Sequence, residues 1–154
     1  MIAGDEELPV LEDFTPGRTF DHHWGRTVTE SDVVLWATQT HLHQPAYVNA
    51  ERARHDGHAH RPVPAGLVFA IVLGLTVEDL SESGGSFLGA DAVRFPAPVH
   101  VGDTLYATSA VVERRASRSR PGWGVVTWRT VGTNQDAVAV VDYRRTSMVP
   151  GRRP

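Results

Sequence analysis

The hydrophobic pattern of the chain is centred on one apolar stretch, residues 64–80. From Leu67 to Val77 it contains no charged residue, and the first charge comes at Glu78. A run of this length is too long for an ordinary strand and too short to cross a bilayer, so it predicts a helix. The helix would have about four turns and a length of roughly 22 Å at ~1.5 Å per residue. Because it is apolar all round, we expect it to be buried on nearly every side.

The segments around this stretch have the patterns of one more helix and several strands. Thr29, followed by acidic residues, is typical of a helix start, and this helix would end near Thr40. After it we expect an irregular polar segment over 41–49, a helical turn over 50–54 and a polar, His-rich loop over 55–62. Turn residues delimit strands predicted at 18–24, 89–95, 104–117, 125–133 and 138–148. The pattern therefore predicts an α+β fold, in which an antiparallel sheet wraps around one long buried helix.

Composition narrows the function classes without naming one. A length of 154 residues predicts a single domain, with its core over about 11–149. The net charge of -3 gives no indication of a nucleic-acid partner. The chain has neither cysteine, which excludes disulfide and thiolate chemistry, nor lysine, which excludes a Schiff base. Residues 1–7 are acidic and lack the apolar core of a signal peptide, so we expect a cytoplasmic protein with no membrane partner.

Five short motifs, taken in this order, carry a resemblance that covers about residues 11–149. The chain resembles the MaoC-like acyl-CoA hydratase/dehydratase family, which has the hot-dog fold. Within that family it is most similar to the branch of mesaconyl-CoA and related methyl-branched enoyl-CoA hydratases. The motifs are Phe14-Thr-Pro-Gly17, Arg26–Asp32, Arg94–Leu105, Ser117–Gly124 and Asn134-Gln135-Asp136.

The resemblance implies a reaction and an assembly. Members add water reversibly across the double bond of an enoyl thioester of CoA or acyl carrier protein, and they need no other cofactor. It implies a homodimer or dimer of dimers, with the two sheets side by side, the central helices back to back and the active sites at the interface. It also implies that the N–H of Gly66, preceded by Ala65, polarises the thioester carbonyl. A helix N-terminus suits that task because it offers unpaired donors and a positive potential.

The loop that carries the acid and base in this family is changed here. Family members place an Asp (or Asn) and a His around a proline. With Pro45 as the reference, these positions hold Leu42 and Tyr47, and Asn49 stands where an Asp often follows. The usual catalytic pair is therefore absent at its matched positions.

Neighbouring residues offer a substitute set. His41 or His43 would act as the base, since histidine titrates near neutrality. Tyr47 would serve as an acid or as a donor that orients water, because tyrosine is a poor base at pH 7. The candidate catalytic residues are thus His41, His43, Tyr47 and Asn49. The alternative is that a histidine on a polar loop is merely solvated.

Two further interpretations remain open. The protein could keep the acyl pocket without hydration chemistry, as an acyl-thioester-binding subunit or as the silent partner of an active paralogue in a heterodimer. The pocket could also serve an isomerisation or cyclisation, which needs the oxyanion donor and one acid/base group. A thioesterase is disfavoured, because hot-dog thioesterases place a carboxylate near the central helix, and this one has none before Glu78.

Two further groups of polar residues are either ligand-binding or simply exposed to solvent. Arg118 and Arg120, in a predicted hairpin, are candidates for the CoA phosphates because guanidinium binds phosphate bidentately; the alternative is exposed hairpin charges. His58, His60 and Asp56 have side chains that zinc accepts, but their spacing matches no standard zinc motif. We therefore expect a solvated loop there and no metal.

Overall fold

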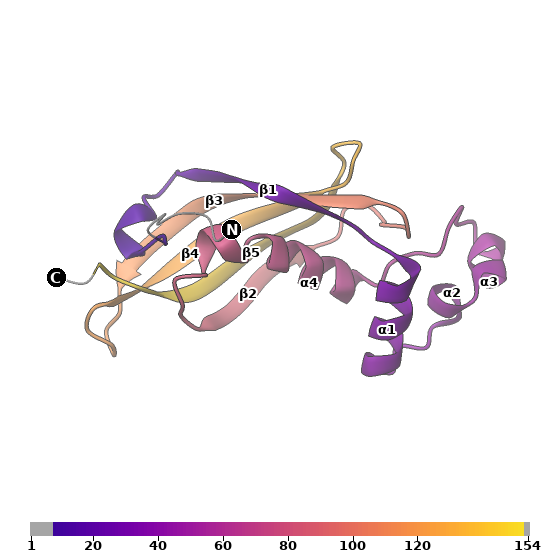
Figure 1. Ribbon diagram of the computed structural model, residues 1–154, viewed down its shortest axis with the longest axis horizontal. Coiled ribbons are helices and arrows are strands. Elements are labelled where there is room, and N and C mark those ends of the chain that lie inside the picture. The colour runs from indigo at the N-terminus through magenta and orange to yellow at the C-terminus, as the bar shows by residue number, and fades with distance from the viewer. Residues whose placement is uncertain (1–7, 153–154) are drawn as a thin grey trace, which may run out of the picture.

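The computed structural model describes residues 8–152, so the acidic residues 1–7 considered above lie outside the described part. Its centre is an antiparallel sheet of five strands in the order β1-β3-β4-β5-β2. Figure 1 shows the sheet curling around helix α4, which confirms the predicted α+β architecture. The strands are β1 (Thr19–Thr27), β2 (Phe87–Arg94), β3 (Thr104–Ala116), β4 (Trp123–Thr133) and β5 (Ala139–Pro150).

The central helix is shorter than predicted. Helix α4 covers Ala65–Leu75, and a separate turn of helix, α5, covers Val77–Leu80. The break lies at Thr76, whose hydroxyl donates to the Leu73 carbonyl over 2.8 Å. Threonine favours such local bonds over the regular ladder, so the prediction of one continuous helix of about four turns was wrong.

The expectation of burial on nearly every side was also wrong for this chain. The face of α4 with Leu67, Val68, Ile71 and Val72 is buried against the sheet. On the other side, a Cβ built at Gly74 would meet no atom of the described residues within 4 Å. Part of the α4 surface, around Gly74, is therefore open in the single chain.

The helices before α4 project beyond one end of the sheet (Figure 1). They are α1 (Glu30–Thr40), α2 (Pro45–Val48) and α3 (Ala50–His55), and a short 3-10 helix, η1 (Leu11–Asp13), precedes β1. Helix α1 starts as predicted, because Thr29 and Asp32 form a reciprocal cap in which each side chain accepts from the other's backbone N–H. The sequence interpretation missed α2, which begins at Pro45, a residue suited to a first helical turn.

The core has two parts. The larger one joins α4 to the sheet, with Val72, Leu105, Val140 and Tyr143 fully buried. The smaller one lies under η1 and α5 and is built around Trp128. Of the helices in the described part, none combines the length and the apolar character that a bilayer crossing requires.

Candidate active site

The first turn of α4 presents backbone donors. Helix α4 follows Pro64, whose side chain has no hydrogen-bond acceptor and therefore cannot cap the helix. The N–H groups of Leu67 and Val68 both donate to the Pro64 carbonyl. Within residues 8–152, no acceptor binds the N–H groups of Ala65 and Gly66. These two donors stand at the positive end of the helix dipole, where negative charge is stabilised.

An apolar cavity of about 270 Å³ opens beside these donors. Val63, Ala65 and Val68 form one wall, and the connector 95–99 forms the other. The connector is tied to the start of the helix by a hydrogen bond from Val63 N–H to the Val99 carbonyl, 2.8 Å long. The sequence interpretation included this connector in the motif Arg94–Leu105 but did not identify it as the wall of a cavity. Its two prolines, Pro96 and Pro98, restrict the backbone, and they are the local feature that indicates a rigid segment here.

The predicted catalytic side chains do not line this cavity. His41 ends α1 in a left-handed conformation (φ 56°), and it is exposed together with His43, at 6.1 Å between the two ring centroids. Tyr47 is half-buried against the core beside α4. Asn49 caps α3, where its side-chain oxygen accepts from two backbone N–H groups at 3.0 Å each. In the single chain the four residues thus have different environments: two exposed histidines, a half-buried tyrosine and a helix cap.

Two residues that the sequence interpretation did not single out hold this end together. A Cβ at Gly66 would lie 3.2 Å from the ring of Trp36, so the first turn of α4 packs on α1 through a glycine. Arg61, with its side chain only 10% exposed, pairs with Glu30 at 2.9 Å and donates to the Tyr47 carbonyl at 3.4 Å. These contacts position α1 and α2 relative to the helix start.

The histidine loop contacts the connector and does not assemble a metal-binding cluster among the described residues. Asp56 pairs with Arg52 at 2.9 Å, and Nδ1 of His58 lies 3.2 Å from Nε2 of His100. Burial lowers the pKa of His100; Asp103 opposes this change, and His58 together with His60 reinforces it.

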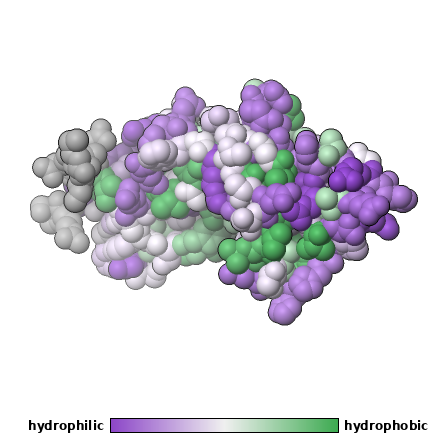
Figure 2. All heavy atoms as spheres, turned by 45° about the vertical axis from the view of Figure 1, so that its right-hand side comes forward, coloured by the Kyte–Doolittle hydropathy of each residue, from purple (hydrophilic) through white to green (hydrophobic). Residues whose placement is uncertain are grey.

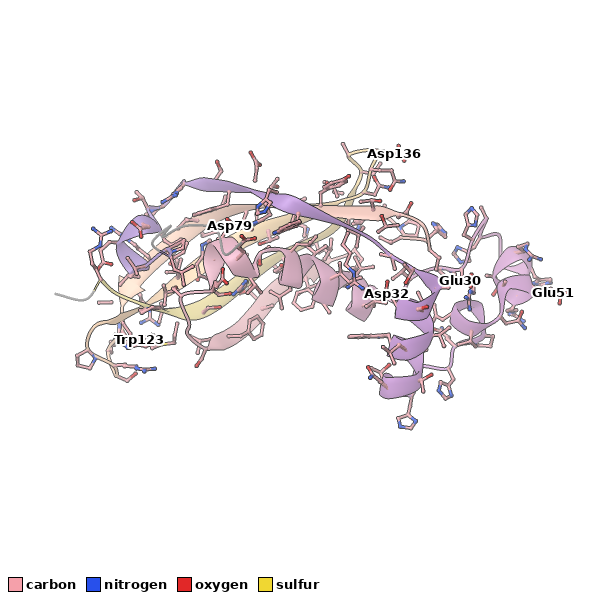
Figure 3. All side chains as sticks on the ribbon, in the orientation of Figure 1. Glu30, Asp32, Glu51, Asp79, Trp123 and Asp136 are labelled. Atoms are coloured by element: carbon pink, nitrogen blue, oxygen red, sulfur yellow. The ribbon has the colours of Figure 1, made fainter. Side chains whose placement is uncertain are left out.

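The two hairpin arginines lie far from the donors of α4. Arg118 and Arg120 are exposed, and the Arg120 guanidinium stacks 3.6 Å from the ring centroid of Trp123. Figure 3 places Trp123 at the end of the sheet opposite Glu51 on α3. Within one chain these arginines therefore do not face Ala65 and Gly66.

A chain of polar contacts lies at the other end of the central helix, and its members His22 and Ser109 are buried. Nδ1 of His22 lies 2.5 Å from Asp79 on α5 (Figure 3), and Nε2 lies 2.9 Å from the Ser109 hydroxyl. Ser109 in turn lies 2.8 Å from the Thr130 hydroxyl. The order Asp-His-Ser is that of a hydrolase triad, but Ser109 is 3% exposed and offers a substrate no access. The arrangement joins α5 to the sheet.

Comparison with known sequences gives a consistent family. The family model described as mesaconyl-CoA hydratase matches residues 3–154. The chain is 44% identical to a mesaconyl-CoA hydratase of Haloarcula marismortui over 150 residues, which are 97% of this chain and 42% of that protein. It is 38% identical to a β-methylmalyl-CoA dehydratase of Chloroflexus aurantiacus, over 100% of this chain and 44% of that protein. An (R)-specific enoyl-CoA hydratase of Rhodospirillum rubrum is 31% identical over 99% of both chains.

Solved structures confirm the predicted hot-dog fold. A MaoC domain protein dehydratase from Chloroflexus aurantiacus matches with a TM-score of 0.89 and 36% identity, over 96% of this chain and 42% of that one. A MaoC-like dehydratase from Rhodospirillum rubrum matches with a TM-score of 0.82 and 25% identity, over 95% and 99% of the two chains. A Mycobacterium tuberculosis protein with a double hotdogfold matches with a TM-score of 0.79 and 24% identity, over 96% of this chain and 46% of that one. The chain thus spans less than half the length of several of its relatives.

Proposed function

The chain belongs to the mesaconyl-CoA hydratase family, and from that premise we propose that it acts in the hydration or dehydration of an enoyl or 3-hydroxyacyl thioester of CoA. The observation that carries the proposal is the pair of unpaired N–H groups at Ala65 and Gly66 beside an apolar cavity. An acyl group would occupy the cavity, and its thioester oxygen would accept from these donors.

The reaction places its charge where the donors are. Hydration forms a C–O bond from water to the β-carbon while a base takes one proton from the water, and the electrons of the double bond move towards the thioester oxygen. The α-carbon then takes a proton and the carbonyl is restored. The Gly66 N–H stabilises the enolate oxygen between these steps, when its negative charge is greatest.

The proton transfers are proposed for the loop of α1–α3, with His41 or His43 as base and Tyr47 as acid. Asn49 belongs to the same candidate set and holds the loop by capping α3. A second candidate function follows from their positions: because none of the four lines the cavity, the chain would bind the thioester while a companion domain supplies the acid and base.

Turnover by the purified chain separates these two candidates. Enoyl-CoAs such as crotonyl-CoA and mesaconyl-CoA would be incubated with the protein, and mass spectrometry would follow the gain of water. Turnover that is lost in His43→Ala or Tyr47→Phe supports the complete enzyme. Stabilisation by an acyl-CoA without turnover supports the binding subunit. If the protein shows neither turnover nor stabilisation, both candidate functions are contradicted.

The oxyanion role has its own test with a matched pair of variants. Gly66→Pro removes the N–H, and a proline is tolerated in the first turn of a helix. Gly66→Ala keeps the N–H and adds a methyl group 3.2 Å from the Trp36 ring. We expect activity or acyl-CoA binding to be lost in the proline variant and retained in the alanine variant. Equal loss in both would assign the effect to the contact with Trp36.

We also propose that the open face of α4 is covered by a second hot-dog domain, which a homodimer or dimer of dimers would supply. Val77 and Phe87, which are 43% and 52% exposed, line one cavity together with Leu73 of α4, and β2, with Leu88 53% exposed, is an edge strand. Figure 2 shows hydrophobic surface (green) on the face that it displays. The alternative partner is an active paralogue in a heterodimer, and the proposed location is the cytoplasm.

The oligomeric state tests this assembly directly. Light scattering coupled to size-exclusion chromatography should give at least twice the chain mass of 16.8 kDa. Leu88→Asp, which places a charge on the exposed edge strand, should shift the protein towards the monomer. A monomeric wild type would leave the heterodimer as the remaining assembly.

A further inference from the structure

Arg145 on β5 is a buried cation without a counter-charge. The residue is 3% exposed, and no carboxylate of the described residues lies within ion-pair distance of its guanidinium. Its Nε donates to the Ser147 hydroxyl at 3.2 Å, and its Nη1 donates to the Thr76 hydroxyl at 2.9 Å. These bonds use two of the five N–H donors of an arginine, and no acceptor in the described part binds Nη2.

The guanidinium is held in place on its other sides. Its central carbon lies 5.5 Å from the ring centroid of Trp128, which is fully buried. Burial lowers the pKa of Arg145, and the neighbouring Tyr143 partly opposes the change. A largely buried cation without an ion-pair partner is costly, and an anion that accepts from Nη2 would lower this cost.

A cavity of about 210 Å³ opens beside this charge, at the C-terminal end of α4. Arg145, Ser147 and Ser81 form its polar part, and Leu73, Val77 and Phe87 form its apolar part. The α4 C-terminus also favours a cation, but the bond to Thr76 occupies only Nη1. Helix capping therefore does not account for the rest of the guanidinium.

We infer that this cavity binds a carboxylate carried on a short apolar group, with Arg145 as the anion-binding residue. A planar carboxylate matches the guanidinium fork and is bound bidentately. One cation among apolar walls suits a singly charged carboxylate better than a phosphate, which asks for more donors. The apolar residues would pack against the carbon chain of the same molecule.

Two molecules could supply this carboxylate. One is a free dicarboxylic acid, and the other is a dicarboxylic acyl thioester, whose second carboxylate stays free. The thioester source rests on the proposed function. It also needs a second domain packed antiparallel on the open face, because the 11 residues of α4 put ~16 Å between Arg145 and the donors of its own chain.

Ligand titrations on the full chain test the inference. Calorimetry would measure mesaconate as the free acid, mesaconyl-CoA, and crotonyl-CoA as the thioester that lacks the carboxylate. Arg145→Gln removes the cation, and Val77→Phe fills the rim while leaving Arg145 in place. Arg144→Gln is the matched control, since Arg144 is the exposed neighbour that pairs with Asp91 at 2.8 Å.

We expect at least one carboxylate ligand to bind saturably, with tenfold or greater weakening in Arg145→Gln and Val77→Phe and less than twofold change in Arg144→Gln. If mesaconyl-CoA binds more tightly than crotonyl-CoA and the difference is lost in Arg145→Gln, the thioester is the source of the carboxylate. If mesaconate binds and the thioesters do not use Arg145, the free acid is the source.

No saturable binding of mesaconate or mesaconyl-CoA, or equal affinity in wild type and Val77→Phe, overturns the inference. Crotonyl-CoA turnover by the wild type is measured separately, so that failure of the proposed function is seen independently.

Discussion

The two ends of helix α4 are built in different ways. At its N-terminal end, the caps of α1 and α3 are local: Thr29 bonds Asp32 three residues away, and Asn49 bonds residues two and three positions away. At its C-terminal end, the polar contacts join remote parts of the chain. His22 is 57 residues from Asp79, and Thr76 is 69 residues from Arg145.

The two ends also differ in the burial of their polar side chains. The histidines predicted to be catalytic lie at the N-terminal end and are exposed, whereas His22 and Arg145 at the C-terminal end are buried. Polar groups removed from water must be hydrogen-bonded, and their loss is costly. The C-terminal end should therefore respond strongly to substitution, and the N-terminal end should respond weakly.

The largest contrast is expected between His22→Ala and His41→Ala. The first leaves Asp79 and Ser109 without their partner and opens a cavity, which should lower the free energy of unfolding by about 3 kcal/mol. The second removes an exposed side chain and should change it by less than about 0.5 kcal/mol. Urea denaturation followed by circular dichroism measures both. Similar losses would show that the two ends do not differ in this way.

A pair of glycines sharpens the comparison along the helix. A Cβ at Gly132 would lie 2.7 Å from Val72 of α4 and 2.7 Å from Val141, so Gly132→Ala should destabilise the fold by about 2 kcal/mol through overpacking. Gly74→Ala adds its methyl group on the open face and should stabilise the monomer by up to about 1 kcal/mol. Thermal unfolding at several protein concentrations tests both. A destabilised, more monomeric Gly74→Ala would show that a second domain approaches there.

A smaller effect is expected at the start of α1. Thr29→Ala removes the hydroxyl that accepts from Asp32 N–H, which should cost about 1 kcal/mol. Thr29→Ser keeps the hydroxyl and should remain within about 0.3 kcal/mol of the wild type. The denaturation midpoints of the two variants test whether the hydroxyl of the cap stabilises the helix. Equal midpoints would mean that packing, not the cap, holds this helix.

The smallest effect concerns pH. Burial, the largest cause, puts the pKa of folded His100 below the unfolded value of 6.5; Asp103 opposes this, and His58 and His60 reinforce it. Between the two pKa values the unfolded chain binds a proton that the folded chain does not, so stability rises with pH. The contribution is complete above the unfolded pKa and is lost as pH falls towards the folded one. In urea denaturation at several pH values, His100→Gln should reduce the loss of stability that the wild type shows as pH falls below 6.5.

Periodic segments were predicted well because their signals are local. The strand expected over 104–117 is β3, Thr104–Ala116, and the helix expected from Thr29 begins there. The extent of the central helix was predicted less well, because the choice of Thr76 between helix and a local bond is not visible in the hydrophobic pattern.

The candidate site shows the same division. Gly66 could be placed at a helix start from the proline and the apolar run around it, and the structure adds an open N–H there. Asn49 was predicted as a candidate catalytic residue of the loop, and in the structure its side chain caps α3. Arg145 lies in a strand among other arginines, and no local pattern distinguishes it from exposed Arg144.

Local chain chemistry thus accounts for the strands, the start of α1, the apolar central helix and the changed catalytic loop, since each depends on neighbours a few residues apart. The buried histidine, the unpaired arginine and the open face of α4 depend on which remote strand lies alongside. Side-chain alternation says that a residue faces inward, but it does not say which group meets it there. Only the packing of β1, β3 and β5 against α4 and α5 decided those partners.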